Sequence, residues 1–182
     1  MKVHTVFILN KAGGLIYQNE INSGLNKLTA NDYLVLAGTL HGVHAIGSRL
    51  TPTIHGKDKA LTTEEYNSNQ NYSIINTVKA QSPNTNRSGL QSIETDMFNL
   101  YIFQTVTGLK FITITSPNGT NPTDPKKGGH SGDLNKNYDI AHEYFRQLYM
   151  IYSDYVMKDP FYSLDMPIKS QLFDAKVREL MG

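Results

Sequence analysis

The segment from Tyr33 to Ser48 contains no Asp, Glu, Lys or Arg, and it constrains the fold more than any other feature of the sequence. Its apolar residues recur at the 3.6-residue spacing of a helix, and Thr29 and Asp32 precede it as candidate N-cap residues. Pro52 marks the end, because the residue before a proline avoids the α conformation. We therefore predict a helix over residues 29–50. Since a surface helix normally carries charge on its outer side, this helix is expected to be covered on both sides.

The helical repeat assigns two faces to this predicted helix. One face suits packing on a β-sheet and comprises Tyr33, Leu36, Leu40, Val43, Gly47 and Leu50. The opposite face comprises Leu34, Gly38, Gly42, Ala45 and Arg49, with His41 beside it. A glycine in a helix costs about 1 kcal/mol relative to alanine, so these glycines indicate a compensating close approach of another backbone. That backbone belongs either to a partner subunit, which the pattern favours, or to an Asn-rich insert or later helix of the same chain.

Apolar runs and turn residues predict the remaining elements. Five strands are expected at residues 4–9, 14–18, 90–95, 97–105 and 109–115, with glycine turns inside both strand groups. Two further helices are expected at residues 139–158 and 170–181. The resulting order, β-β-α-β-β-β-α-α, predicts an α+β fold with a five-stranded antiparallel sheet and helices packed on it.

The length of 182 residues is typical of a single domain, which we expect to span residues 1–182. Two stretches, residues 51–88 and 117–137, are rich in polar residues, proline and glycine and hold few large apolar residues. Such segments bury too little apolar surface to order themselves, so both are predicted to be inserted loops.

Composition excludes several classes of function. The net charge of +1 provides no basic surface for nucleic acid, and the absence of cysteine excludes thiolate metal sites. The N-terminus has no leader pattern, and no apolar run approaches the roughly 20 residues of a membrane span. We therefore expect a cytoplasmic protein without direct membrane insertion.

No constellation of residues predicts catalysis. The sequence has neither a phosphate-binding loop nor a correctly spaced nucleophile elbow. His41 and His44 could share a metal on one helix face, but no acidic residue of that helix completes a site. We predict no catalytic residues, no cofactor-binding residues and no metal ligands, and interpret the two histidines as packing or interface residues.

Five stretches of the sequence resemble the synbindin-like subunits of the transport protein particle (TRAPP), a family with the longin, or SNARE-like, fold. The longest is IYSDYVMKDPFYSLDMPIKS, at residues 151–170. The others are residues 10–18, 40–52, 93–98 and 104–111. Together they cover nearly every predicted element in order.

The resemblance implies the same fold and a non-catalytic role within the core of the complex. It implies that the chain pairs with a second longin-like subunit. With neighbouring subunits, the pair would bind a Rab-type small GTPase of ER-to-Golgi traffic and accelerate guanine-nucleotide exchange. Such exchange works by holding the switch segments away from the nucleotide and its Mg²⁺. It further implies peripheral association with ER and cis-Golgi membranes.

Candidate contact residues follow from the pattern and the resemblance together. The first set is the outer side of the first helix, with Gly38, His41, Gly42, Ala45 and Arg49. The second set lies at the end of the second helix and comprises Tyr152, Asp154, Tyr155, Lys158 and Asp159. Aromatic and charged side chains there could serve recognition, or they could merely end the helix and anchor the last segment.

Two alternatives share the fold but not the exchange activity, namely a longin-type SNARE and a coat-adaptor subunit. A SNARE needs a heptad helix and a membrane anchor after the longin domain, and an adaptor would lack the 151–170 motif. One departure from the family concerns the position of extra residues. Animal members carry a PDZ-like insertion between the second strand and first helix, where residues 19–30 are too short for one. The extra residues follow the first helix instead, which indicates a fungal-type member.

Overall fold

The structure is a computed structural model that describes residues 2–24, 28–50, 85–86, 89–117 and 131–182. Its elements in chain order are β1 (Val3–Leu9), β2 (Leu15–Glu20), α1 (Ala30–Gly47), β3 (Thr85–Asn86), β4 (Ser92–Glu94), β5 (Asn99–Thr105), β6 (Lys110–Thr115), α3 (Ser131–Tyr152), the π-helical turn η1 (Ser153–Met157) and α4 (Gln171–Met181). All strand pairs are antiparallel. The predicted α+β class is therefore confirmed.

The strands form one sheet in the order β2-β1-β6-β5, with β3 and β4 both pairing with β5. β4 pairs with the first part of β5, and β3 pairs with its end at Gln104 and Thr105. The two short strands thus occupy one interrupted edge position, so the sheet keeps the five positions expected from the sequence. β3 lies inside the predicted insert at 51–88, so the prediction of a loop is wrong for these two residues. Residues 51–84 of that insert lie outside the described part of the chain.

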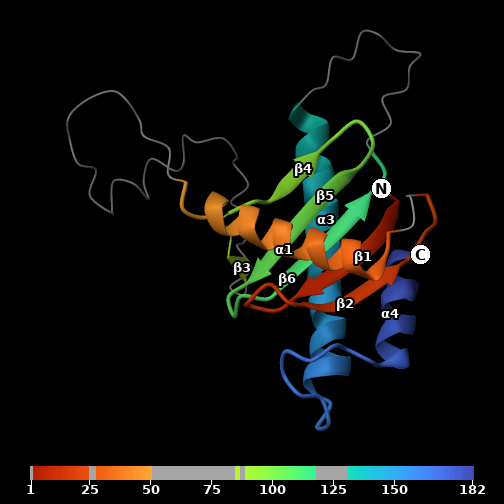
Figure 1. The fold of residues 1–182 in the computed structure, drawn as a ribbon. Coiled ribbons are helices and arrows are strands. Elements are labelled where there is room, and N and C mark those ends of the chain that lie inside the picture. The colour runs from red at the N-terminus through yellow and green to blue at the C-terminus, as the bar shows by residue number, and fades with distance from the viewer. Residues whose placement is uncertain (1, 25–27, 51–84, 87–88, 118–130) are drawn as a thin grey trace, which may run out of the picture.

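The three helices lie on two sides of the sheet (Figure 1). α1 crosses one face, whereas α3 and α4 pack on the opposite face. Because both faces are covered, all seven residues of β1 and all six of β6 are buried. This explains why β1 ends in a continuous apolar run, Val6 to Leu9, rather than in alternating apolar and polar residues.

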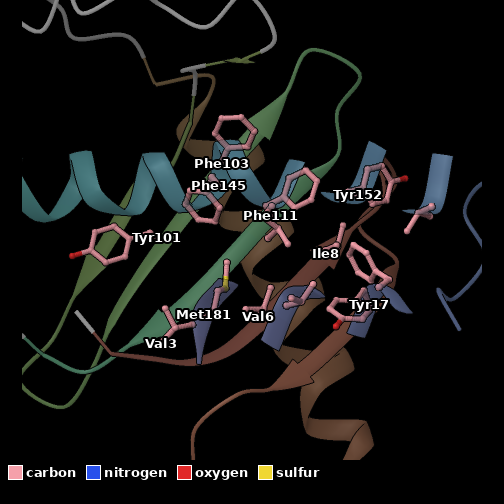
Figure 2. Close-up of a cluster of buried hydrophobic side chains, with 14 of the residues drawn as sticks. Val3, Val6, Ile8, Tyr17, Tyr101, Phe103, Phe111, Phe145, Tyr152 and Met181 are labelled. Carbon is pink, nitrogen blue, oxygen red and sulfur yellow. The ribbon is translucent and has the colours of Figure 1, made fainter. Parts of the chain in front are cut away.

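The larger core lies between the sheet and the helices α3 and α4. Its aromatic centre is Phe103, which stacks on Phe145 of α3 at 5.6 Å between ring centroids, and Phe111, which meets Tyr152 edge-on at 5.7 Å (Figure 2). One apolar stripe along α3 and η1 faces this core. Its buried members are Ala141, Phe145, Leu148, Tyr152 and Val156, and Tyr138 and Tyr155 are partly buried.

Two helix boundaries differ from the expectation: α1 ends at Gly47 rather than Leu50, and the start of α3 differs by more. α3 begins at Ser131, whereas residues 117–137 were predicted to form a loop and the helix to begin at Asp139. The first turns of α3 have no apolar stripe that a search for periodicity could detect. A helix that is already nucleated by its packed part extends at little cost, because each added residue gains one backbone hydrogen bond.

The described helices contain none with both the length and the apolar character needed to cross a membrane.

Candidate interaction surfaces

Helix α1 begins with a reciprocal capping box. The Asp32 backbone N–H donates to Thr29 Oγ1 at 3.3 Å, and the Asp32 carboxylate accepts from the Thr29 backbone N–H at 2.9 Å. Hydrogen bonds from the Thr29 side chain and backbone lower the pKa of the Asp32 carboxyl. The cap satisfies donors that an α-helix otherwise leaves unpaired, and it fixes where α1 starts over the sheet.

The inner face of α1 packs on the sheet through Tyr33, Ala37, Leu40 and His44. Tyr33 contacts the Phe7 ring at 5.6 Å, and His44 Nδ1 lies 3.1 Å from the Leu90 carbonyl oxygen. The predicted inner stripe is wrong at two positions, because Val43 and Leu50 are 44% and 73% exposed. Small Ala37 and hydrogen-bonded His44 take their place.

The outer face of α1 is apolar and exposed. We define it by Leu34, Val35, Gly38, Gly42, Val43, Ala45 and Ile46. Leu34, Val35 and Ile46 are 57%, 60% and 63% exposed. A Cβ atom placed on Gly38 or Gly42 would meet no described atom within 4 Å. α3 and α4 lie across the sheet, so neither of these later helices covers this face.

The first set of candidate residues divides between two environments. Gly38, Ala45 and Arg49 are exposed and Gly42 is half-buried, as a contact surface requires. His41 instead turns toward the β1–β2 turn, where its ring lies 2.6 Å from the position that a Cβ on Gly13 would occupy. His41 is therefore a packing residue of this turn.

A buried ammonium group lies near His41. Lys110 of β6 is only 4% exposed, and its Nζ donates to the Gly108 carbonyl oxygen at 3.3 Å. Within the described residues no carboxylate lies within ion-pair distance of it. Burial lowers the pKa of Lys110. Burial, and secondarily the charges of Lys110 and His44, lower the pKa of His41.

The second set of candidate residues surrounds the end of α3 and η1. Asp154 and Lys158 form an ion pair of 2.6 Å in which both side chains are more than half exposed. Asp159 Oδ1 accepts a hydrogen bond from the Phe161 backbone N–H at 2.9 Å, and Tyr155 is half-buried. Tyr152 was expected to contact a partner, and this is wrong because it is 2% exposed and packs in the core. Its place in the apolar stripe of the helix decides this burial.

Sequence reasoning missed the side chains that follow this helix end. Phe161 is 94% exposed, and Met157, Leu164 and Met166 are 48%, 67% and 57% exposed. We call these four residues the C-terminal turn surface. Two of them, Phe161 and Met166, line a pocket of about 320 Å³ whose wall also includes Tyr155, Asp159 and Lys169. The sequence does hold one indication of this surface. Phe161 directly follows Asp159-Pro160, which ends the helix, so the residue cannot belong to a buried helical stripe.

The described residues contain no group of three or more His, Asp or Glu side chains arranged to hold a metal ion. What they offer is two exposed apolar surfaces on different layers of the molecule. Such surfaces are typical of proteins that assemble with other proteins.

Comparison with known proteins places the chain in a family. A model described as the sybindin-like family matches residues 3–127 and 132–182. The chain belongs to the sybindin-like family. The fold is accordingly the longin fold, and the resemblance found in the sequence is confirmed.

Curated relatives of this sybindin-like chain carry one name, trafficking protein particle complex subunit 4. The relative from Dictyostelium discoideum is 34% identical over 182 residues, which cover 100% of this chain and 98% of that protein. The relatives from Bos taurus and Homo sapiens are 33% and 32% identical over 162 residues. Those alignments cover 89% of this chain and 51% of each relative, so the chain spans about half the length of these two proteins.

Proposed function

We propose that this sybindin-like chain is a non-catalytic subunit of a trafficking protein particle and that the α1 outer face binds a second longin-like subunit. The names of the curated relatives support membership of the particle. One observation carries the choice of surface: α1 has an uncharged, exposed face with open space above Gly38 and Gly42.

The physical argument concerns the cost of leaving this face in water. Leu34, Val35 and Ile46 expose more than half of their surface on a helix about 27 Å long. Each such side chain contributes about 1.5–3 kcal/mol when it is fully buried. The two glycines allow a partner backbone to approach closely, which increases the contact area per residue. Together these features favour a protein partner over solvent.

We further propose that the assembled particle accelerates guanine-nucleotide exchange on a Rab-type small GTPase in ER-to-Golgi traffic. The chain would supply surface rather than chemistry, since exchange requires only that switch segments be held away from the nucleotide and Mg²⁺. Cytoplasmic location with peripheral attachment to ER and cis-Golgi membranes belongs to the same proposal. A coat-adaptor or SNARE-like longin subunit would form the α1 contact without any exchange activity.

The test uses the full chain, alone and mixed with each recombinant longin-like subunit of the particle. Light scattering after size-exclusion chromatography gives the mass of the species, and release of a fluorescent GDP analogue from Rab-type GTPases gives exchange activity. We expect a one-to-one pair, and faster GDP release once the other subunits are added. A chain that stays monomeric with every subunit would contradict the proposal. Assembly without faster GDP release would favour the coat-adaptor alternative.

The substitution Gly42→Glu tests the surface. It adds a carboxylate where no described atom would lie within 4 Å of the new Cβ, so the monomer should fold and keep its circular-dichroism spectrum. In the pair the carboxylate would be buried without a partner, at a cost of about 3–5 kcal/mol. We expect pairing to weaken by at least a hundredfold, on the order of 3 kcal/mol.

Met97→Glu is the matched control, because Met97 is 78% exposed on the β4–β5 turn, away from α1. It adds the same charge to an exposed apolar position and should leave pairing unchanged. If Gly42→Glu pairs as tightly as this control, the interface lies elsewhere.

A further inference from the structure

The chain between η1 and α4 forms a hydrogen-bonded turn. The carbonyl oxygen of Asp159 accepts from the Tyr162 backbone N–H at 3.2 Å, and Asp159 Oδ1 accepts from that of Phe161 at 2.9 Å. The Tyr162 hydroxyl donates to the Met166 carbonyl oxygen at 2.9 Å. The Ile168 backbone N–H then donates to the Ile16 carbonyl oxygen of β2 at 2.8 Å. The turn is therefore attached to the sheet at its end and is braced internally.

These hydrogen bonds fix a turn whose aromatic side chain, Phe161, points into solvent. Phe161 is 94% exposed although the neighbouring Tyr162 is half-buried and packs against the core. Asp165 adopts a φ of 68°, a left-handed conformation that aspartate, like asparagine, tolerates better than most residues. A hydrogen-bonded turn that presents an exposed phenylalanine is typical of an anchor residue, because the conformation that binds is already formed.

The C-terminal turn surface is separate from the α1 outer face. α1 lies on one face of the sheet, and the turn joins α3 to α4 on the opposite side (Figure 1). A partner that packs on α1 therefore leaves Phe161 available to another protein.

Charge distinguishes the kind of partner. Lys158 is neutralised by Asp154, whereas Asp159 and Asp165 have no ion-pair partner among the residues that the structure describes. Lys169 shares the pocket wall with Phe161 and Asp159, so the turn from Asp159 to Lys169 carries two carboxylates and one ammonium group, a net charge of −1. An anionic membrane repels such a surface, and loops that bind anionic lipid are instead rich in Lys and Arg. A protein pocket with basic residues at its rim complements both the ring and the charges.

We propose that Phe161 anchors this chain in an apolar pocket, rimmed by Lys or Arg, on a second protein that is different from the partner of α1. The proposal uses the proposed function only to choose the probes, which are the recombinant particle subunits and a Rab-type GTPase. Asp159 shapes the turn through its hydrogen bonds, and Asp165 faces the basic rim.

The experiment measures binding of the full chain to each probe by calorimetry or surface plasmon resonance, for wild type, Phe161→Ala and Asp165→Asn. Phe161→Ala should weaken one contact by at least tenfold and leave the contact that Gly42→Glu disrupts unchanged. Asp165→Asn keeps a residue that tolerates positive φ, so the turn should persist. Asp165→Asn should weaken this contact less than Phe161→Ala does, and the affinity that remains should depend less on salt concentration.

Met97→Ala is the control for loss of an exposed apolar side chain and should change neither contact. Thermal unfolding should be the same for all variants, since Phe161 packs on almost nothing. Wild-type affinity of Phe161→Ala for every probe overturns the proposal. It is also overturned if wild type, but not Phe161→Ala, sediments with vesicles of phosphatidylcholine and phosphatidylserine, since a membrane would then be the partner. If Gly42→Glu pairs normally with the longin-like subunit, only the assignment of that interface to α1 is wrong. The binding of Phe161→Ala to the probes still tests the present proposal.

Discussion

At the scale of single residues, glycines in this chain serve two opposite purposes. Gly13 has a φ of +91° and faces the His41 ring, so it gives the β1–β2 turn both its conformation and its close contact with α1. Gly38 has an ordinary helical conformation and open space around it. The same substitution should therefore have opposite effects at the two positions.

We expect Gly13→Ala to lower the free energy of unfolding by about 1–3 kcal/mol, because alanine is strained at positive φ. In addition, its Cβ would lie 2.6 Å from the His41 ring. Gly38→Ala should raise the unfolding free energy by up to about 1 kcal/mol through helix propensity. The same Cβ should weaken pairing through α1, because it obstructs close approach. Urea denaturation of both variants measures their free energies of unfolding. An equal loss of stability in Gly13→Ala and Gly38→Ala would contradict the prediction that the two substitutions have opposite effects.

The second prediction at this scale concerns pH. The pKa of His41 is lowered in the folded chain, chiefly by burial, and the groups that face it are His44 and Lys110. Above about pH 6.5 the histidine is neutral in both states and has no effect. As the pH falls below this value, the unfolded chain binds the proton more readily, so the folded state loses stability.

We expect the unfolding free energy of wild type to fall more between pH 7 and pH 5 than that of His41→Gln, which cannot titrate. Urea denaturation at several pH values measures the difference between the two slopes. Parallel slopes would show that His41 does not carry this effect.

At the scale of elements, α3 combines two separate functions along its length. Its middle part closes the larger core through buried residues such as Phe145 and Leu148, which are 3% and 0% exposed. Its end continues as the π-helical turn η1, in which Val156 stays buried while Asp154 and Met157 are exposed. The change of helix type shifts the register of the side chains, which lets one end of the helix present residues outward.

We expect Phe145→Ala to lower the unfolding free energy by about 3–5 kcal/mol, since it removes a fully packed ring that stacks on Phe103. Met150→Ala is the control on the same helix, because Met150 is 48% exposed. Its effect should stay within about 0.5 kcal/mol. Thermal or urea unfolding of both variants makes the comparison. Similar losses for the two would mean that α3 does not pack as described.

At the scale of the whole molecule, the sheet separates two cores and, with them, two outward surfaces. α1 seals one side and exposes its own apolar outer face, whereas α3 and α4 seal the other and hold the turn that carries Phe161 (Figure 1). According to the two proposals, the chain holds two different proteins on separate surfaces without competition between them. This arrangement suits a subunit that lies inside a larger assembly.

The agreement between the predicted and the observed secondary structure varies from one element to another. The starts of α1 and α4 follow from local signals, since Thr29 and Ser170 cap the two helices, whereas α1 ends at Gly47, three residues before the predicted end. β3 and the start of α3 have no local signal, because their positions depend on pairing with β5 and on packing farther along α3. Among the proposed contact residues, Gly38, Gly42 and Ala45 lie on the exposed side of α1, whereas Tyr152 is buried.

The sequence by itself determined which segments are apolar, where α1 and α4 begin, and that α1 carries no Asp, Glu, Lys or Arg after Asp32. These properties depend on residue type and on spacing along one element. Only the tertiary structure decided that His41 turns to Gly13, that Tyr152 belongs to the core and that Phe161 stands in solvent. A periodic pattern shows which side chains share a face, but contacts between distant segments decide which of those faces is covered.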